Sequence, residues 1–355
     1  MANGSERQLV AAANAPKPVG PYSPAILAGD YLFFSGQGAR DAAGRMPEGI
    51  EAQARQCLEN VKTIAEAAGL NLKHIVHLQL YLEHIGNFEI VDRVYADYFP
   101  DDPPARAVIG VTRMPTGTPV EMTAVAVRDL GLKEVIELNS LKPLGHASSA
   151  IAVASKVYFS AVYGQTLSEA ETGLTLALSE ASLVREEIVF RNDYATTPVA
   201  MIPVQELPAT FAAAISAIAL RGEPTTGDAS AFCRSDGELI YCTAQTARGV
   251  ETIQGQVQGV MNKLQVILQQ HGTDLAHAVV CNIYLDDLEE FKLMNDTYAA
   301  FFTDLPPTRT TVQPFPSSDR ALSDVPLVRI SLWAIKSRGV TSVVSLSHRN
   351  NEAVP

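Results

Sequence analysis

The sequence has few of the features that bind metals or nucleotides. Its seven histidines form no H-E-x-x-H pair, and its four cysteines (Cys57, Cys233, Cys242 and Cys281) lack C-x-x-C spacing. Zinc sites and disulfide frameworks are recognised by such spacings. No G-x-x-x-x-G-K-[ST] segment occurs, and no G-x-G-x-x-G follows a strand-like run. We therefore expect no metal, no other cofactor and no disulfide framework.

Basic runs and long apolar runs are also absent. The formal net charge is −12, whereas a protein that neutralises phosphates ordinarily carries a basic stripe. No continuous apolar stretch approaches the length of a membrane span, and the first residues lack the basic and apolar regions of a signal peptide. We expect a cytoplasmic protein that binds neither nucleic acid nor membrane.

Length and composition indicate folded domains. At 355 residues the chain is too long for one ordinary small core, and 47% of it is hydrophobic. That share is enough to fill more than one core. We expect two or three domains.

One twelve-residue segment occurs twice. Residues 95–106 read YADYFPDDPPAR and residues 298–309 read YAAFFTDLPPTR, and the match extends without a gap back to Gln53 and Gln256. In each copy, apolar residues recur at helical spacing, then alternate, then recur at helical spacing again. The pattern predicts a helix, a strand buried on one face, and a second helix that ends at Pro-Pro.

A shorter upstream segment occurs three times. GPYSPAILAGDYLFFSGQG begins at Gly20, GHASSAIAVASKVYFSAVYG begins at Gly145, and DGELIYCTAQTAR is the third version. We therefore divide the chain into a complete unit, a truncated unit, a second full unit and a polar tail that we expect to be frayed. These are residues 1–131, 139–222, 223–336 and 337–355, with residues 132–142 as the first linker.

The middle unit is the least certain part of this division. TGLTLALSEASLV predicts its helix and EEIVFRNDY its strand, but the following ATTPVAMIPVQELPATFAAAISAIAL shows no clear pattern. An alternative stays open, in which residues 139–336 form one unit that carries a long insertion. A hairpin, helix, strand, helix, strand order predicts an α+β fold in which helices cover one face of a mixed sheet.

The ordered motifs GPYSPAI, FFSGQ, QARQCLENVKTIAEAAGL, PPAR and PVEMTAVAV resemble the RidA (YjgF) reactive-intermediate deaminase family. The first unit matches along nearly its whole length, and the third from about residue 237 to 313. The resemblance implies chorismate-mutase-like units, fused here into a pseudo-trimer with ligand clefts between them. It also implies hydrolysis of 2-imino or enamine acids to 2-keto acids and ammonia without a metal.

The resemblance also assigns site residues in the first unit. Arg106 matches the carboxylate-binding arginine, Glu121 the water-positioning glutamate, and Tyr22 the cleft tyrosine. An arginine fork suits a carboxylate, and hydrolysis needs a group that orients water. Further substrate-binding positions match at Ser35, Gly36 and Gln37, and two positions depart from the common family residues, Asp92 from asparagine and Val108 from cysteine.

The other units match the family less completely. Asn295 and Arg309 fit the pattern in the third unit, but Arg329 stands where the first unit has Glu121. The middle unit has Ala147 in the tyrosine position and no recognisable PPxR. We therefore expect one competent cleft, formed by Arg106, Glu121 and Tyr22, with a small carboxylate-bearing imine or enamine as its ligand.

Alternatives stay open at this stage. Both repeated arginines could be structural, pairing with a nearby carboxylate. The protein could instead be a non-catalytic module that binds small carboxylates, or a chorismatase-like hydrolase on the same fold. The shortened middle unit could also expose an apolar flank to another copy of the chain, giving a homo-oligomer.

Overall fold

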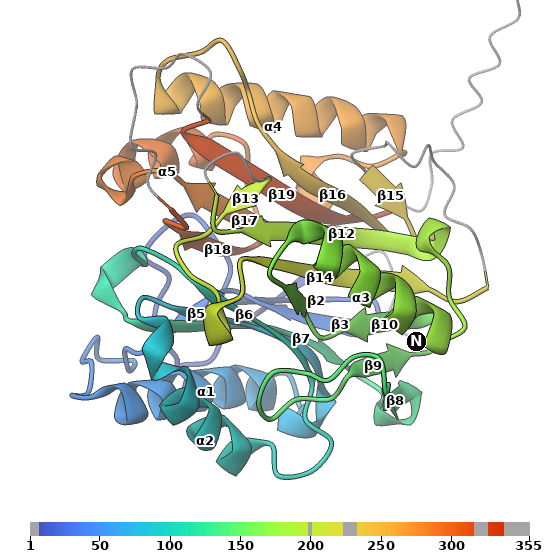
Figure 1. The fold of residues 1–355 in the computed structure, drawn as a ribbon. Coiled ribbons are helices and arrows are strands. Elements are labelled where there is room, and N and C mark those ends of the chain that lie inside the picture. The colour runs from blue at the N-terminus through green and yellow to red at the C-terminus, as the bar shows by residue number, and fades with distance from the viewer. Residues whose placement is uncertain (1–6, 198–200, 223–232, 316–325, 337–355) are drawn as a thin grey trace, which may run out of the picture.

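The computed structural model describes four stretches of the chain: residues 7–197, 201–222, 233–315 and 326–336. Their strands form three sheets, each built from one continuous region of sequence (Figure 1). We call these regions the first unit (7–132), the second unit (133–222) and the third unit (233–336). The tail 337–355, which we expected to be frayed, lies outside the described residues.

The first unit has seven strands and two α-helices. The sheet order is β1 (Arg7–Val10), β2 (Ala25–Ala28), β3 (Tyr31–Phe34), β7 (Val120–Val127), β5 (Ile75–Leu82) and β6 (Ala105–Gly110), with β4 (Gln37–Gly38) paired to β7. Strands β5 and β6 are parallel and the other pairs are antiparallel. Helices α1 (Ile50–Ala67) and α2 (Phe88–Tyr98) pack on one face of this sheet.

The predicted periodicity explains these helices. Helix α1 buries Ala54, Leu58 and Val61 against the sheet, and Gly69 follows its end at a φ of 74°, in the left-handed region that favours glycine. Helix α2 stops before the two prolines, which cannot continue a helix and lead directly into β6.

The third unit repeats this arrangement. Its sheet order is β15 (Cys233–Ser235), β16 (Leu239–Gln245), β19 (Val328–Ile335), β17 (Ala278–Leu285) and β18 (Thr308–Val312), covered by α4 (Ile253–Gln270) and α5 (Phe291–Ala299). The PPTR segment leads into β18 as PPAR leads into β6. Both copies of the repeated sequence therefore have the same secondary structure, and the predicted α+β class is confirmed.

The second unit is the most altered. Its sheet order is β13 (Ile202–Pro203), β12 (Ile188–Ala195), β14 (Ala213–Leu220), β10 (Lys156–Phe159), β9 (Ala150–Val153) and β8 (Lys133–Ile136), with β11 (Val162–Gly164) paired to β14 and α3 (Leu167–Glu180) as the helix. No counterpart of α2 occurs among the residues described in this unit.

Two parts of the second unit differ from the sequence interpretation. The expected linker contributes β8, which pairs with β9 as β1 pairs with β2. The stretch without a clear pattern contains β14, whose eight residues are all buried. A strand buried on both faces has no reason to alternate, so its periodicity could not reveal it.

The inner faces of the three sheets meet in a shared core. Each unit has its own core between helices and sheet, while Phe33, Tyr158, Phe190, Tyr241 and Trp333 come from different units and pack together. This second contact explains why β5 is buried along nearly its whole length although its sequence predicts one buried face. Figure 1 shows α1 and α2 at one side of the sheets and α4 and α5 at the opposite side.

Three tyrosines mark the pseudo-threefold relation between the units. Tyr81, Tyr194 and Tyr284 are each the seventh residue of the corresponding strand, β5, β12 or β17. All three are buried in one cluster. Equivalent positions from three units that meet in this way surround a common axis.

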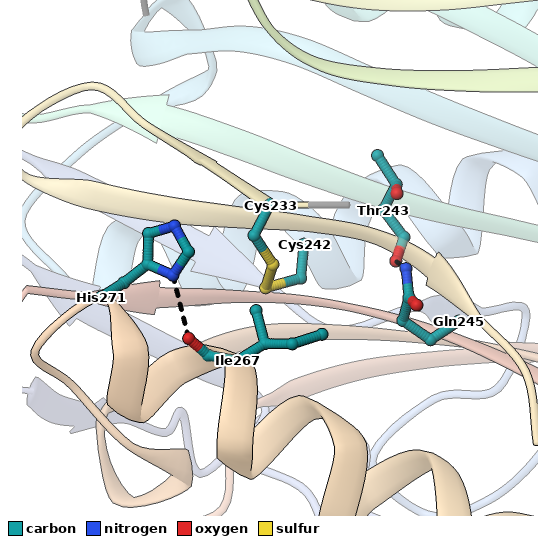
Figure 2. Close-up of a disulfide and its surroundings, with 6 residues drawn as sticks. All are labelled: Cys233, Cys242, Thr243, Gln245, Ile267 and His271. Carbon is teal, nitrogen blue, oxygen red and sulfur yellow. Dashed lines mark hydrogen bonds between the residues drawn. A yellow bond between two sulfur atoms is a disulfide. The ribbon is translucent and has the colours of Figure 1, made fainter. Parts of the chain in front are cut away.

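A disulfide joins Cys233 and Cys242 (Figure 2). Our expectation that the cysteine spacing opposes disulfides is wrong for this pair. The turn between β15 and β16 brings the two residues directly opposite each other, with their Cα atoms 4.1 Å apart. This pairing depends on strand register, which linear spacing does not show. Cys57 and Cys281 are unbridged and buried.

Candidate functional site

A cavity of about 330 Å³ lies where the third unit meets the first. The first unit contributes Tyr22, Gly36, Gln37 and Glu121 to its wall, and the third unit contributes Arg309. The cavity therefore belongs to neither unit alone. Its polar side chains are brought together by the packing of β18 against the end of β3.

Hydrogen bonds between backbone and serine hold this junction. The backbone N–H of Arg309 donates to Ser35 Oγ at 2.8 Å, and the N–H of Gly36 donates to the Arg309 carbonyl at 3.2 Å. Ser35 Oγ in turn donates to the Ser23 carbonyl at 2.6 Å. The backbone N–H of Ser23 donates to the Pro307 carbonyl, and its hydroxyl donates to the Pro306 carbonyl. The repeated Pro-Pro-x-Arg segment is thus fixed against the GPYSPA and SGQ motifs.

The side chain of Arg309 is buried among aromatic rings. Its guanidinium carbon lies 5.1 Å from the ring centre of Tyr22, 5.2 Å from that of Tyr298 and 5.6 Å from that of Phe291. Burial lowers the pKa of this arginine from its usual value. Its Nε and Nη1 atoms have no hydrogen-bond partner, and no salt bridge joins it to a carboxylate in the described part of the chain. Nε and Nη1 of Arg106 are equally buried and unpartnered, so what distinguishes Arg309 is that it lines the cavity and has no carboxylate partner among the described residues.

Asn295 lies beside this guanidinium. A Cβ atom added at Gly20 would be 2.7 Å from Arg309 Nη2 and 3.1 Å from Asn295 Oδ1. A side chain at this position would therefore displace the guanidinium of Arg309 from its place beside Asn295. Asn295 carries no charge and leaves the positive charge of Arg309 uncompensated.

Glu121 lies over the backbone of Gly36. A Cβ atom at Gly36 would be 2.0 Å from Glu121 Oε1, so a side chain there would displace the carboxyl group. Glu121 is 7% exposed. Burial raises its pKa to about 8, although the charge of Arg309 acts in the opposite direction. At neutral pH this carboxyl group is therefore largely protonated.

Arg106 lies at a different junction, between the first and second units. Its backbone N–H donates to Ser160 Oγ at 2.8 Å, as that of Arg309 does to Ser35. Its Nη2 forms a salt bridge with Asp92 at 2.5 Å and also donates to the Leu144 carbonyl at 2.9 Å. The charge of Arg106 is therefore compensated within the protein.

The contents of the two junctions differ at equivalent positions. Asp92 corresponds to Asn295, and Ala147 corresponds to Tyr22. Ala214 pairs with Tyr194 as Glu121 pairs with Tyr81, so the second unit has no carboxylate at this point. Tyr163 also lies in the Arg106 junction. Its hydroxyl accepts a hydrogen bond from the Val108 N–H at 2.8 Å, and its ring stacks on the ring of Phe211.

The structure thus regroups the predicted site residues. Our expectation that Arg106 shares a cleft with Tyr22 and Glu121 is not met, because the cavity forms between units and receives its arginine from the third. Asp92 and Val108 lie with Arg106, and the remaining predicted residues lie around the cavity. That second group consists of Tyr22, Ser35, Gly36, Gln37, Glu121, Asn295 and Arg309.

The expected position of Arg329 agrees with the strand register. Arg329 pairs with Tyr284 as Glu121 pairs with Tyr81. Burial lowers the pKa of Arg329. The third unit therefore presents a cation at the position where the first unit presents a carboxyl group.

Arg40 and Phe291 are among the residues of the cavity wall that the sequence did not assign to the site. Arg40 follows the SGQ motif closely, and this nearness was the available signal for it. Phe291 was visible only as an apolar residue of a helix. No group of three His, Cys, Asp or Glu side chains suited to a metal occurs in the part of the chain that the structure describes.

Comparison with known proteins identifies the family. Residues 12–128 and 231–315, together more than half of the chain, match the model of the family described as Endoribonuclease L-PSP. The chain belongs to this family. The resemblance to RidA (YjgF) proteins is thereby confirmed. None of the helices in the described ranges is long and apolar enough to cross a membrane.

Several relatives match about a third of the chain with nearly their whole length. A RutC family protein of Pyrococcus horikoshii is 41% identical over 125 residues, which cover 35% of this chain and 99% of that protein. A Bos taurus protein named 2-iminobutanoate/2-iminopropanoate deaminase is 38% identical over 124 residues, covering 34% of this chain and 90% of that protein.

Solved structures show the same coverage. A crystal structure of a putative endoribonuclease from Thermotoga maritima is 37% identical and covers 34% of this chain and 98% of its own, with a TM-score of 0.34. The structure of the Escherichia coli YjgF gene product is 36% identical and covers 34% of this chain and 99% of its own, also with a TM-score of 0.34.

Proposed function

We propose that the cavity between the third and first units hydrolyses 2-imino or enamine acids to 2-keto acids and ammonia. One observation carries the proposal: the guanidinium of Arg309, which forms no salt bridge with a carboxylate of the described residues, and the buried carboxyl group of Glu121 line the same cavity. The relative named 2-iminobutanoate/2-iminopropanoate deaminase supports the same reaction class.

Arg309 would hold the substrate carboxylate. A guanidinium offers parallel N–H donors that match the two oxygens of a carboxylate, and a charged pair of this kind is strongest where water is excluded. The aromatic rings around Arg309 limit the directions that its fork can take. The substrate's C=N carbon, bonded to the held carboxylate, would then face Glu121.

Glu121 would supply and recover the protons. Its protonated carboxyl donates a proton to the imine nitrogen and so makes the C=N carbon more electrophilic. The resulting carboxylate accepts a proton from water while the water oxygen forms a bond to that carbon. Glu121 then passes this proton to the amino nitrogen. The C–N bond breaks and ammonia leaves, while the hydroxyl group on the same carbon gives its proton to Glu121 and becomes the keto group. One water is consumed, and one 2-keto acid and one ammonia are formed.

The junction of the first and second units would not take part. Its arginine is paired with Asp92, and it has alanines in place of both the tyrosine and the glutamate. We therefore propose one catalytic cleft in the fused chain. The role of Arg106 is structural in this proposal, since it joins Asp92 to the Leu144 carbonyl across the junction.

The test is ammonia release from 2-imino acids generated in the assay by an amino-acid oxidase. The protein should accelerate release above the spontaneous rate, and a Glu121→Gln variant should lose most of the acceleration. A protein that is thermally stabilised by small 2-keto acids but releases no extra ammonia would be a carboxylate-binding module instead. That result would refute the proposed hydrolysis.

A further inference from the structure

Arg40 places a second guanidinium on the wall of the cavity that contains Arg309 and Glu121. It lies two residues beyond β4, on the segment that enters the cavity wall at Gly36. Neither the family match nor the proposed hydrolysis gives this side chain a role. Hydrolysis of a simple imino acid requires only one carboxylate-binding cation.

The guanidinium of Arg40 is held in place by backbone carbonyls. Its Nη1 donates to the Gly44 carbonyl at 2.9 Å and its Nη2 donates to the Thr116 carbonyl at 2.7 Å. Both acceptors belong to turns that also line the cavity. Arg40 forms no salt bridge with a carboxylate of the described residues, so its charge is oriented but not compensated.

The other charges on this wall leave the cavity positive. Lys17 lines it and is exposed. Asp41 also lines it, but Asp41 forms a salt bridge with Arg45 at 2.7 Å. Burial keeps Glu121 largely protonated at neutral pH because its pKa is raised to about 8. A positive cavity in a chain of net charge −12 favours an anionic ligand.

The size of the cavity leaves room for a substrate side chain. Its volume of about 330 Å³ exceeds what an imino acid of three carbons would fill. Pockets of roughly 300–1,000 Å³ generally hold much larger ligands. A ligand fixed at Arg309 can therefore extend along the wall on which Arg40 lies.

We propose that the preferred substrates are 2-imino acids whose side chain ends in a second carboxylate, the imines of acidic amino acids. Arg309 binds the carboxylate next to the C=N carbon, and Arg40 binds the distal one. This assignment rests on the proposed function. It predicts that Arg40 determines specificity without touching the reacting atoms.

The experiment compares imines made in the assay from aspartate and glutamate with imines made from alanine and leucine. For the wild-type protein, kcat/KM for the acidic imines should exceed that for the apolar imines by about tenfold or more. Arg40→Gln should lower this ratio by about 10- to 100-fold, the effect of losing one charge-assisted contact. Turnover of the apolar imines should stay within about threefold of the wild-type value.

Matched variants separate specificity from structural damage. Loosening of the turn that Arg40 holds would slow all imines equally and leave the ratio unchanged. Arg40→Glu should reverse the preference toward imines with a basic side chain. Arg55→Gln, which removes an exposed arginine of α1 that pairs with Asp97, should leave both rates and their ratio unaltered. An unchanged ratio in Arg40→Gln, or a wild-type protein without preference for acidic imines, overturns the assignment.

A separate binding measurement distinguishes failure of the proposed hydrolysis from failure of the proposed selectivity for a second carboxylate. Dissociation constants of 2-oxoglutarate and pyruvate, the products of an acidic and an apolar imine, are measured by calorimetry for the wild type and Arg40→Gln. If ammonia release is absent but 2-oxoglutarate binds more tightly through Arg40, the proposed hydrolysis fails and the selectivity holds. Equal binding of the two keto acids counts against the selectivity.

Discussion

The backbone N–H of Arg309 donates to the hydroxyl of Ser35 across the junction of the third and first units. Arg106 makes the same bond to Ser160 across the junction of the first and second units. The two arginines therefore start from the same backbone position. Their side chains differ in what surrounds them, since Arg106 meets Asp92 whereas Arg309 has Asn295 as its neighbour.

Substitution of the two arginines should have unequal effects on imine hydrolysis. Arg309→Gln should lower kcat/KM by about 30- to 1,000-fold, because loss of a charge-assisted carboxylate contact costs on the order of 2–4 kcal/mol of transition-state stabilisation. Arg106→Gln should stay within about threefold of the wild type. Ammonia release measured side by side checks both.

The comparison of the two arginines has its own control. Circular dichroism must show that each variant is folded, because Arg106→Gln leaves Asp92 without its buried partner. Severe loss of activity in a folded Arg106→Gln, with an active Arg309→Gln, would place the chemistry at the other junction.

Glu121 should make the stability of the protein depend on pH. Its folded pKa of about 8 lies above that of an unfolded glutamate, so the free energy of unfolding falls as pH rises from about 4.5 to about 8. Glu121→Gln removes this titration. The variant should be more stable than the wild type at pH 7, by on the order of 3 kcal/mol, and equally stable at pH 4. Urea unfolding at both pH values measures the difference.

The sign of this effect is diagnostic. A Glu121 held ionised by Arg309 would have a lowered pKa, and its replacement by glutamine would destabilise the protein at pH 7. A less stable variant at pH 7 would therefore contradict a protonated Glu121.

Gly36→Ala should inactivate the cleft without unfolding the chain. The new Cβ would fall 2.0 Å from Glu121 Oε1 and so displace the carboxyl group. Misplacement of a catalytic group by about 1 Å can cost about 100-fold in rate. Gly86→Ala is the matched control, because no atom lies within 4 Å of the Cβ position at Gly86. Equal ammonia release by both variants would show that Glu121 is not placed as proposed.

The description Endoribonuclease L-PSP raises the question of RNA. With a net charge of −12 and no basic run, the chain should not bind single-stranded RNA at physiological salt. Fluorescence anisotropy of a labelled oligonucleotide, titrated at two salt concentrations, measures this. Saturable binding that weakens with salt would disprove the prediction.

The sequence by itself determined the local structure of the repeat. Apolar spacing is a property of neighbouring residues, so it predicted α1, β5 and α2 together with α4, β17 and α5. The Pro-Pro pairs correctly lie beyond the second helices, because proline cannot continue a helix, but the helices themselves end earlier, at Tyr98 and Ala299. The same motifs, read in order, indicated the family.

The sequence did not predict features that depend on what packs around a strand or pairs with it. Strand β14 is buried on both faces, which removes the alternation that identifies a strand. The sequence suggested a linker where strand β8 lies. This segment is a strand because it pairs with β9, a contact that its own residues do not reveal. The Cys233–Cys242 disulfide likewise depends on the register of a hairpin.

Only the tertiary structure decided which arginine meets Glu121. The sequence indicated that one arginine would bind a carboxylate, and the resemblance implied clefts between units, yet grouping residues by unit assigned Glu121 to Arg106. The packing of β18 against the end of β3 brings Arg309 to the cleft instead. A helix or strand reflects interactions between residues close in sequence, whereas this cleft depends on how the sheets of the third and first units pack together, which no local pattern encodes.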